Sequence, residues 1–167
     1  MHRDNKEIPV GEFIDVLNDR KSQNKFRIFG VSNWSLERFI EANKWAKNND
    51  KSGFSILNNN LSLCKMIKPL WDGCVSSNDD KILDYLEKTK TAHLSWSSQG
   101  RGYFLSNKKV QEIENQISKN ETWRKPGENC SGPLSCFDSK DNRERKKRSI
   151  LLAKKLNTTC QNIAGAW

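Results

Sequence analysis

The stretch Gly30-Val31-Ser32-Asn33-Trp34 follows an apolar run at residues 26–29 and precedes a segment whose apolar residues recur at helical spacing. A strand that ends in Gly, followed by Ser and Asn at the start of a helix, is typical of the carboxyl edge of a parallel sheet. Ligands bind at that edge, and small hydrogen-bonding side chains can contact them there. The stretch therefore predicts one strand-to-helix unit of an α/β fold.

The same alternation of strand and helix continues along the chain. Apolar runs predict strands at residues 26–29, 54–57 and 92–96. Apolar spacing predicts helices that begin near Pro9, Ser35, and Asp79 or Asp80. Strands that alternate with helices favour βα units on a parallel sheet, and the length of each unit suits a (β/α) barrel. Residues 119–139, which contain several Pro and Gly, are predicted to be irregular.

Length and composition are compatible with one folded domain over residues 1–167. Of the 167 residues, 35% are hydrophobic and 29% are charged, which lies at the polar end of the globular range. The sequence contains no apolar run long enough to cross a bilayer, and its first residues lack the apolar core of a signal peptide. We therefore expect a soluble cytoplasmic protein with no membrane partner.

The cysteines give no sign of a disulfide framework or a metal site. There are five of them, an odd number, and no two have the CxxC spacing of zinc ligands. We expect mostly thiols, partly buried, and no bound metal.

The net charge of +9 is concentrated in a basic segment at residues 143–155. Such a segment can bind nucleic acid or a nuclear import receptor. It also continues into the apolar residues Ile150, Leu151, Leu152, Ala153 and Leu156. We favour a helix that docks this apolar stripe and leaves its cations in water, because no aromatic cluster accompanies the charge.

Four short motifs, in order and at matching spacing, make the chain resemble the aldo/keto reductases. The motifs are Met1-His2-Arg3-Asp4, Gly30-Val31-Ser32-Asn33, Leu57-Asn58-Asn59-Asn60-Leu61-Ser62-Leu63 and Trp96-Ser97-Ser98-Gln99-Gly100-Arg101-Gly102. Members of that family are NADP-dependent oxidoreductases built on a (β/α)8 TIM barrel. Each motif is short, but together they extend over most of the chain.

The resemblance implies a partial TIM barrel, comprising about strands four to seven with their helices. The N-terminal strands, which in the family carry the catalytic Asp, Tyr and Lys, have no counterpart in this chain. The last strand, with the basic site for the adenosine 2′-phosphate, has none either. A partial barrel would have open strand edges, which favour self-association.

His2 matches the family histidine that orients the substrate carbonyl. A neutral imidazole can donate a hydrogen bond to a carbonyl oxygen without carrying charge. The alternative is that His2 is simply part of a frayed terminus.

Ser32 and Asn33 match the pair that holds the carboxamide of the nicotinamide. Both residue types are equally suited to capping the next helix, although Ser35 is also available for that role. Asn58 stands where the family usually has Gln, another carboxamide contact, and its side chain is shorter.

Trp96 matches the aromatic residue that stacks on the nicotinamide ring, and the alternative is a Trp in the core or at the barrel rim. The resemblance assigns the loop around the cofactor pyrophosphate to Ser97, Gln99 and Arg101. Gly100 lies in the same loop, where we expect it to let the backbone approach closely.

The implied function is hydride transfer from NADPH to an aldehyde or ketone, by a chain that is inactive alone. One alternative is a truncated, non-catalytic protein that binds nucleotides or associates with itself. The other is a nucleic-acid binder that uses the basic segment.

Overall fold

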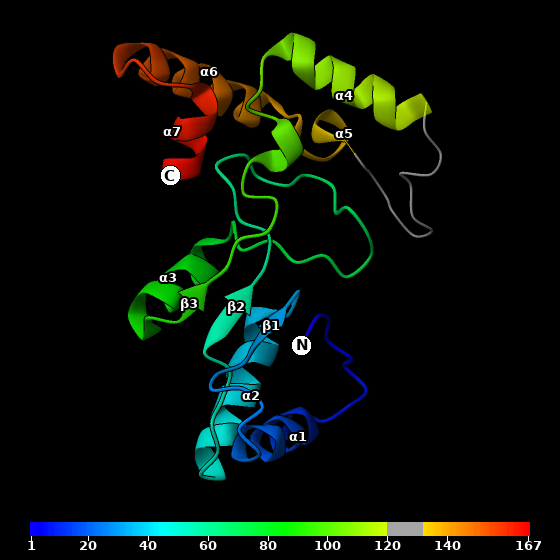
Figure 1. Ribbon diagram of the computed structural model, residues 1–167, viewed down its shortest axis with the longest axis vertical. Coiled ribbons are helices and arrows are strands. Elements are labelled where there is room, and N and C mark those ends of the chain that lie inside the picture. The colour runs from blue at the N-terminus through cyan, green and yellow to red at the C-terminus, as the bar shows by residue number, and fades with distance from the viewer. Residues whose placement is uncertain (120–131) are drawn as a thin grey trace. The chain divides into compact units, whose positions relative to one another are not determined.

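The computed structural model describes residues 1–119 and 132–167, which form two compact units (Figure 1). The first unit comprises Met1–Asn59 and Asp79–Leu94, and the second comprises Asn60–Asn78 and Ser95–Trp167. The chain therefore leaves the first unit, returns to it and leaves it again.

The first unit is an α/β fold around a small parallel sheet. Its strands are β1 (Gly30–Ser32), β2 (Ile56–Asn58) and β3 (Ala92–His93), in the order β1-β2-β3, with both pairs parallel. Its helices are α1 (Val10–Ser22), α2 (Leu36–Asn48) and α3 (Asp80–Thr89). Helix α2 connects β1 to β2, and α3 precedes β3, which confirms the predicted alternation of strands and helices.

The first strand begins four residues later than predicted. Residues 26–29 precede β1, and Phe29 packs its ring edge-on against Phe54, with ring centroids 5.8 Å apart. At Gly30 a Cβ atom would lie 2.4 Å from the backbone oxygen of Ile56, so only glycine allows β1 to approach β2 there. The predicted strand at residues 54–57 shifts to Ile56–Asn58, and the one at 92–96 is reduced to Ala92–His93.

The core of the first unit forms around Trp34 and Phe39, both fully buried. The ring of Trp34 meets Phe13 and Phe54 edge-on, with ring centroids 5.5 and 5.2 Å apart. These aromatic pairs join α1, the segment before β2 and the turn after β1.

The predicted helix starts are confirmed at all three positions. The Ser35 side chain caps α2 by accepting a hydrogen bond from the Arg38 backbone N–H, and Asp79 caps α3 in the same way. Pro9 lies at the N-cap of α1 and not inside its first turn. On α2, Ile40 is 38% exposed, whereas Phe39, Ala42 and Ala46 are buried.

A buried amide holds the corner between β1 and α2. Asn33 has a left-handed backbone with φ of 58°, and its N–H donates to Asn59 Oδ1 at 2.8 Å. Asn59 Nδ2 donates in turn to the carbonyl of Trp34 at 3.0 Å. The fully buried Asn59 thus fixes the turn that sends Trp34 into the core.

The second unit is mainly helical. It contains the 3-10 turn η1 (Gly100–Gly102) and helices α4 (Asn107–Lys119), α5 (Pro133–Phe137), α6 (Lys140–Lys155) and α7 (Cys160–Ala166). Helix α5 corrects the prediction of an irregular stretch at residues 119–139, part of which lies outside the described residues. Pro at the first turn of α5 is compatible with a helix, so the Pro and Gly content did not exclude one.

The prediction for the basic helix α6 is wrong for most of the apolar stripe, of which Ala153 alone is buried. Its buried residues are Asn142, Lys146, Ser149 and Ala153. Leu151 and Leu156 are each 59% exposed, and Ile150 and Leu152 are exposed as well. Polar contacts fix the helix: Asn142 Oδ1 accepts from the Lys65 N–H at 3.0 Å, and Lys146 Nζ donates to Asn107 Oδ1 at 3.0 Å.

The cysteine prediction holds in part. Cys64, Cys74 and Cys160 are thiols, whereas Cys136 is disulfide-bonded. An odd cysteine count argues against a complete framework, but it does not exclude a single bridge. Burial, the main cause, raises the pKa of the Cys64 thiol to about 11.

Within the described residues, no helix is both long enough and apolar enough to cross a bilayer.

Replacing Asn59 with Ala should lower the free energy of unfolding by about 2 kcal/mol, because the Trp34 carbonyl loses its buried donor. Urea unfolding followed by circular dichroism would measure the change. Asn48→Ala, at an exposed position of α2, is the control and should change stability by less than about 0.5 kcal/mol. Equal effects of the two substitutions would contradict the role of Asn59.

Candidate functional site

A cavity of about 410 Å³ lies along the sheet of the first unit and is lined by both the first and the last residues of β1 and β2. Ser32 and Asn58, the last residues of β1 and β2, line it together with His2. The remaining lining residues are Met1, Gly30, Val31, Ile56 and Leu94. The structure therefore brings three of the predicted site residues to one cavity.

His2 is placed there because Met1 pairs with the free side of β1. The Met1 amino group donates to the Gly30 carbonyl at 2.8 Å, and the Ser32 N–H donates to the Met1 carbonyl at 2.9 Å. This is the bonding pattern of a parallel neighbour. Desolvation lowers the pKa of the Met1 amino group. His2 follows directly, with an exposed side chain at the carboxyl end of the sheet.

A largely buried ion pair anchors the segment that carries His2. Arg38 Nε and one terminal nitrogen donate to the two Asp4 carboxylate oxygens at 3.0 and 3.2 Å. The same guanidinium donates to the Ile8 carbonyl at 2.8 Å and lies over the Trp34 ring, 5.5 Å from its centroid. The Asp4 contact raises the pKa of Arg38. The amino-acid sequence does not reveal this pair, because Arg38 lies 34 residues from Asp4 and no local pattern connects them.

Ser32 and Asn33 are both buried, and they differ in what they contact. The Asn33 side-chain amide donates to Ser32 Oγ at 3.2 Å, and Asn33 is not among the residues lining the cavity. Ser35 already caps α2, so neither residue is needed as a helix cap. In this arrangement Asn33 orients the Ser32 hydroxyl, which faces the cavity.

The Asn58 side chain is hydrogen-bonded to Leu94, the residue directly after β3. Its Nδ2 donates to the Leu94 carbonyl at 2.7 Å. This contact fixes the amide plane at the edge of the cavity. The next residue, Asn59, is buried and holds the corner between β1 and α2. No sequence pattern singled it out as a site residue.

The other predicted cofactor residues belong to the second unit. Trp96 stacks on Trp71, with ring centroids 5.5 Å apart and 22° between the planes. Its carbonyl accepts from Asn60 Nδ2 at 3.1 Å. One face of the Trp96 ring is therefore already covered, and a stacked ligand would need the other face.

The loop at residues 97–102 is tightly folded. Ser97 and Arg101 both have left-handed backbones, and the Gly100 N–H donates to the Ser97 carbonyl at 2.8 Å. Gln99 Nε2 donates to the Gln161 carbonyl at 3.1 Å. A Cβ atom on Gly100 would lie 2.3 Å from Cys64 Sγ, so the close approach at this glycine is to the core of its own unit.

Among residues 1–119 and 132–167, no group of three or more His, Cys, Asp or Glu gathers as metal ligands would.

No protein-family profile and no curated protein sequence matches the chain. Its structure is similar to that of the glycerol dehydrogenase AKR11B4 from Gluconobacter oxydans, an aldo/keto reductase, with a TM-score of 0.60 and 18% sequence identity. The similarity covers 96% of this chain and 42% of the dehydrogenase, so the chain spans less than half the length of that enzyme. The likeness shows an α/β fold similar to that of an aldo/keto reductase barrel.

Replacing Asp4 with Ala should destabilise the first unit by about 3 kcal/mol, because Arg38 then remains largely buried without its carboxylate. Thermal and urea unfolding would measure the loss. Asp19→Ala removes a carboxylate that is 60% exposed and serves as the control. A loss of less than about 0.5 kcal/mol from Asp4→Ala would rule out an anchoring role.

Proposed function

We propose that this chain supplies the nicotinamide-binding part of an NADP(H)-dependent oxidoreductase of the aldo/keto reductase type. The cavity carries the proposal, because Ser32 and Asn58 line it at the carboxyl ends of β1 and β2, where parallel sheets bind ligands. The fold similarity to an aldo/keto reductase supports it.

The lining of the cavity fits a nicotinamide ring. Its volume of about 410 Å³ lies within the range of ligand pockets. Ile56 and Leu94 offer apolar walls for a flat ring. The Ser32 hydroxyl and the Asn58 amide offer a donor and an acceptor that can pair with a carboxamide.

His2 is the residue that we assign to the substrate. Its exposed imidazole lines the same cavity as Ser32 and can donate a hydrogen bond to a carbonyl oxygen. The bound cofactor would supply the hydride for reduction of an aldehyde or ketone.

For the second unit, we assign Trp96 to stacking on the nicotinamide and Ser97, Gln99 and Arg101 to the cofactor pyrophosphate. A guanidinium and hydroxyl groups suit phosphate oxygens.

NADPH should bind to the 167-residue chain. Loss of one hydrogen bond between the cavity and the cofactor should weaken that binding about 2- to 10-fold. Ser32→Ala and Asn58→Ala each remove one such contact from the cavity. The dissociation constant would be measured by NADPH fluorescence titration, with circular dichroism to confirm folding.

Ser55→Ala and Asn48→Ala are matched controls, since both residues are exposed and neither lines the cavity. They should leave the affinity within about 2-fold, a change below the energy of one hydrogen bond. A folded chain that does not bind NADPH would refute the proposal.

The purified chain should not oxidise NADPH in the presence of aldehydes or ketones. The resemblance finds no counterpart here of the tyrosine that donates the proton, or of its Lys and Asp neighbours. Absorbance at the NADPH band would report turnover, with the cofactor alone as the blank. Steady oxidation that disappears in His2→Ala would contradict inactivity while supporting the assignment of His2.

The sheet edge supports a second candidate, self-association without catalysis. Within the described residues, β3 pairs only with β2, and Leu94 beside it is 54% exposed. An edge strand next to an exposed apolar side chain is prone to pair with another chain. Sedimentation velocity would show a defined oligomer in this case, and Leu94→Lys would shift it to monomer.

A further inference from the structure

A groove of about 540 Å³ lies between α6 and α7 in the second unit, where α7 folds back against α6 (Figure 1). We refer to it as the α6–α7 groove. Its apolar lining consists of Leu63, Leu152, Leu156, Ile163, Ala166 and Trp167. Leu156 is 59% exposed and Trp167 is 61% exposed, so the groove presents large apolar side chains to solvent.

Cations lie along the α6 side of this groove. Arg145 and Arg148 line it, and Arg145 is held by a hydrogen bond of 2.8 Å to Asn142 Oδ1. Helix α6 as a whole carries eight Lys or Arg and only two acidic residues. An apolar floor beside a positive rim is complementary to a ligand that is apolar on one face and acidic along its flanks.

We propose that the α6–α7 groove binds an acidic amphipathic helix of a partner protein. The apolar side chains of that helix would lie on Leu152, Leu156 and Trp167. Its carboxylates would face Arg145 and Arg148. Recognition of a helix in a groove uses apolar anchors at helical spacing, with charges at the rim to set orientation.

A membrane fits α6 less well than a peptide. The exposed residues Ile150, Leu151 and Leu152 are consecutive, so they point to three different sides of the helix. Binding in a bilayer interface needs one continuous apolar face. Apolar side chains set in a groove between two helices instead suit a narrow, elongated ligand.

Two other occupants also fit the groove less well. A second copy of the chain would bring two basic helices together, which repel each other. A nucleic acid would place phosphates against an apolar floor.

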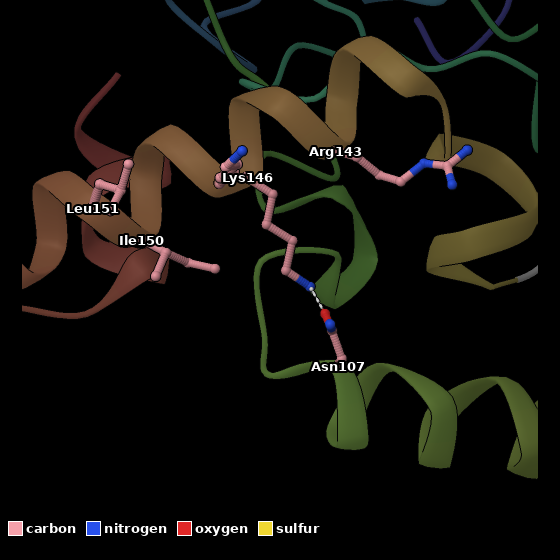
Figure 2. A pocket seen from close by; sticks show the side chains of 6 residues that line it. Asn107, Arg143, Lys146, Ile150 and Leu151 are labelled. Carbon is pink, nitrogen blue, oxygen red and sulfur yellow. Dashed lines mark hydrogen bonds between the residues drawn. The ribbon is translucent and has the colours of Figure 1, made fainter.

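In a second cavity along α6, of about 310 Å³, Arg143 points away from the Lys146 amine, which is bonded to Asn107 (Figure 2). These cations therefore do not converge on one phosphate.

The test uses a fluorescein-labelled synthetic helix with Leu at i, i+3, i+4 and i+7 and Glu on its flanks. Fluorescence anisotropy with the 167-residue chain should show saturable binding that weakens with salt. The same helix with Lys in place of Glu should bind at least about 10-fold more weakly, because like charges then face each other.

Two pairs of variants locate the site. Leu156→Ser should weaken binding of the Glu helix about 5-fold or more, whereas Leu151→Ser, equally exposed but outside the groove, should have little effect. Arg148→Glu should weaken binding strongly, and Lys147→Glu, with the same change of charge outside the groove, should weaken it less. Circular dichroism would confirm that each variant is folded.

Three results would overturn the proposal. The first is no binding of the Glu helix by the folded chain. The second is equal effects of the groove variants and their controls. The third is competition in which phosphatidylglycerol vesicles or an oligonucleotide bind more tightly than the Glu helix and show the same dependence on Leu156 and Arg148.

Discussion

The first unit depends on the two hydrogen bonds of one buried amide. Asn59, the residue directly after β2, accepts from the Asn33 N–H and donates to the Trp34 carbonyl. It therefore joins the ends of two neighbouring strands and holds Asn33 in a left-handed turn. That turn sends Trp34 into the core and leaves Ser32 at the sheet edge. Core packing and the geometry of the cavity consequently share one constraint.

A few contacts to the same core also hold the N-terminal segment in place. The Trp34 ring fills the core, and the Arg38 guanidinium lies over it while binding Asp4. The backbone of Met1 joins the free side of β1, and His2 follows at the cavity. We therefore expect a change in α2 that moves Arg38 to displace the histidine through Asp4. His2 is positioned through packing and an ion pair, in addition to its own backbone bonds.

Local patterns in the sequence were enough to predict the βα alternation and the capping of α2 and α3. Ser35 and Asp79 are recognisable because N-caps depend on residues close in sequence. The start of β1 was misplaced because the run at residues 26–29 is apolar for a different reason: Phe29 packs on Phe54, while the strand itself needs Gly30 to approach Ile56. Of the predicted site, His2, Ser32 and Asn58 meet at one cavity. The Asp4–Arg38 pair could not be predicted, because it depends on tertiary structure.

Helix α6 shows why hydrophobic pattern alone can mislead. Its leucines suggested a buried stripe, yet the helix buries Asn142, Lys146 and Ser149, each with a specific partner. Burying a lysine costs free energy, and desolvation lowers the pKa of Lys146 accordingly. The Asn107 oxygen and the face of the Tyr103 ring, 5.3 Å from the amine, offset part of that cost. Because polar contacts fix the helix in place, Leu152 and Leu156 remain exposed beside α7, where they form one wall of the α6–α7 groove.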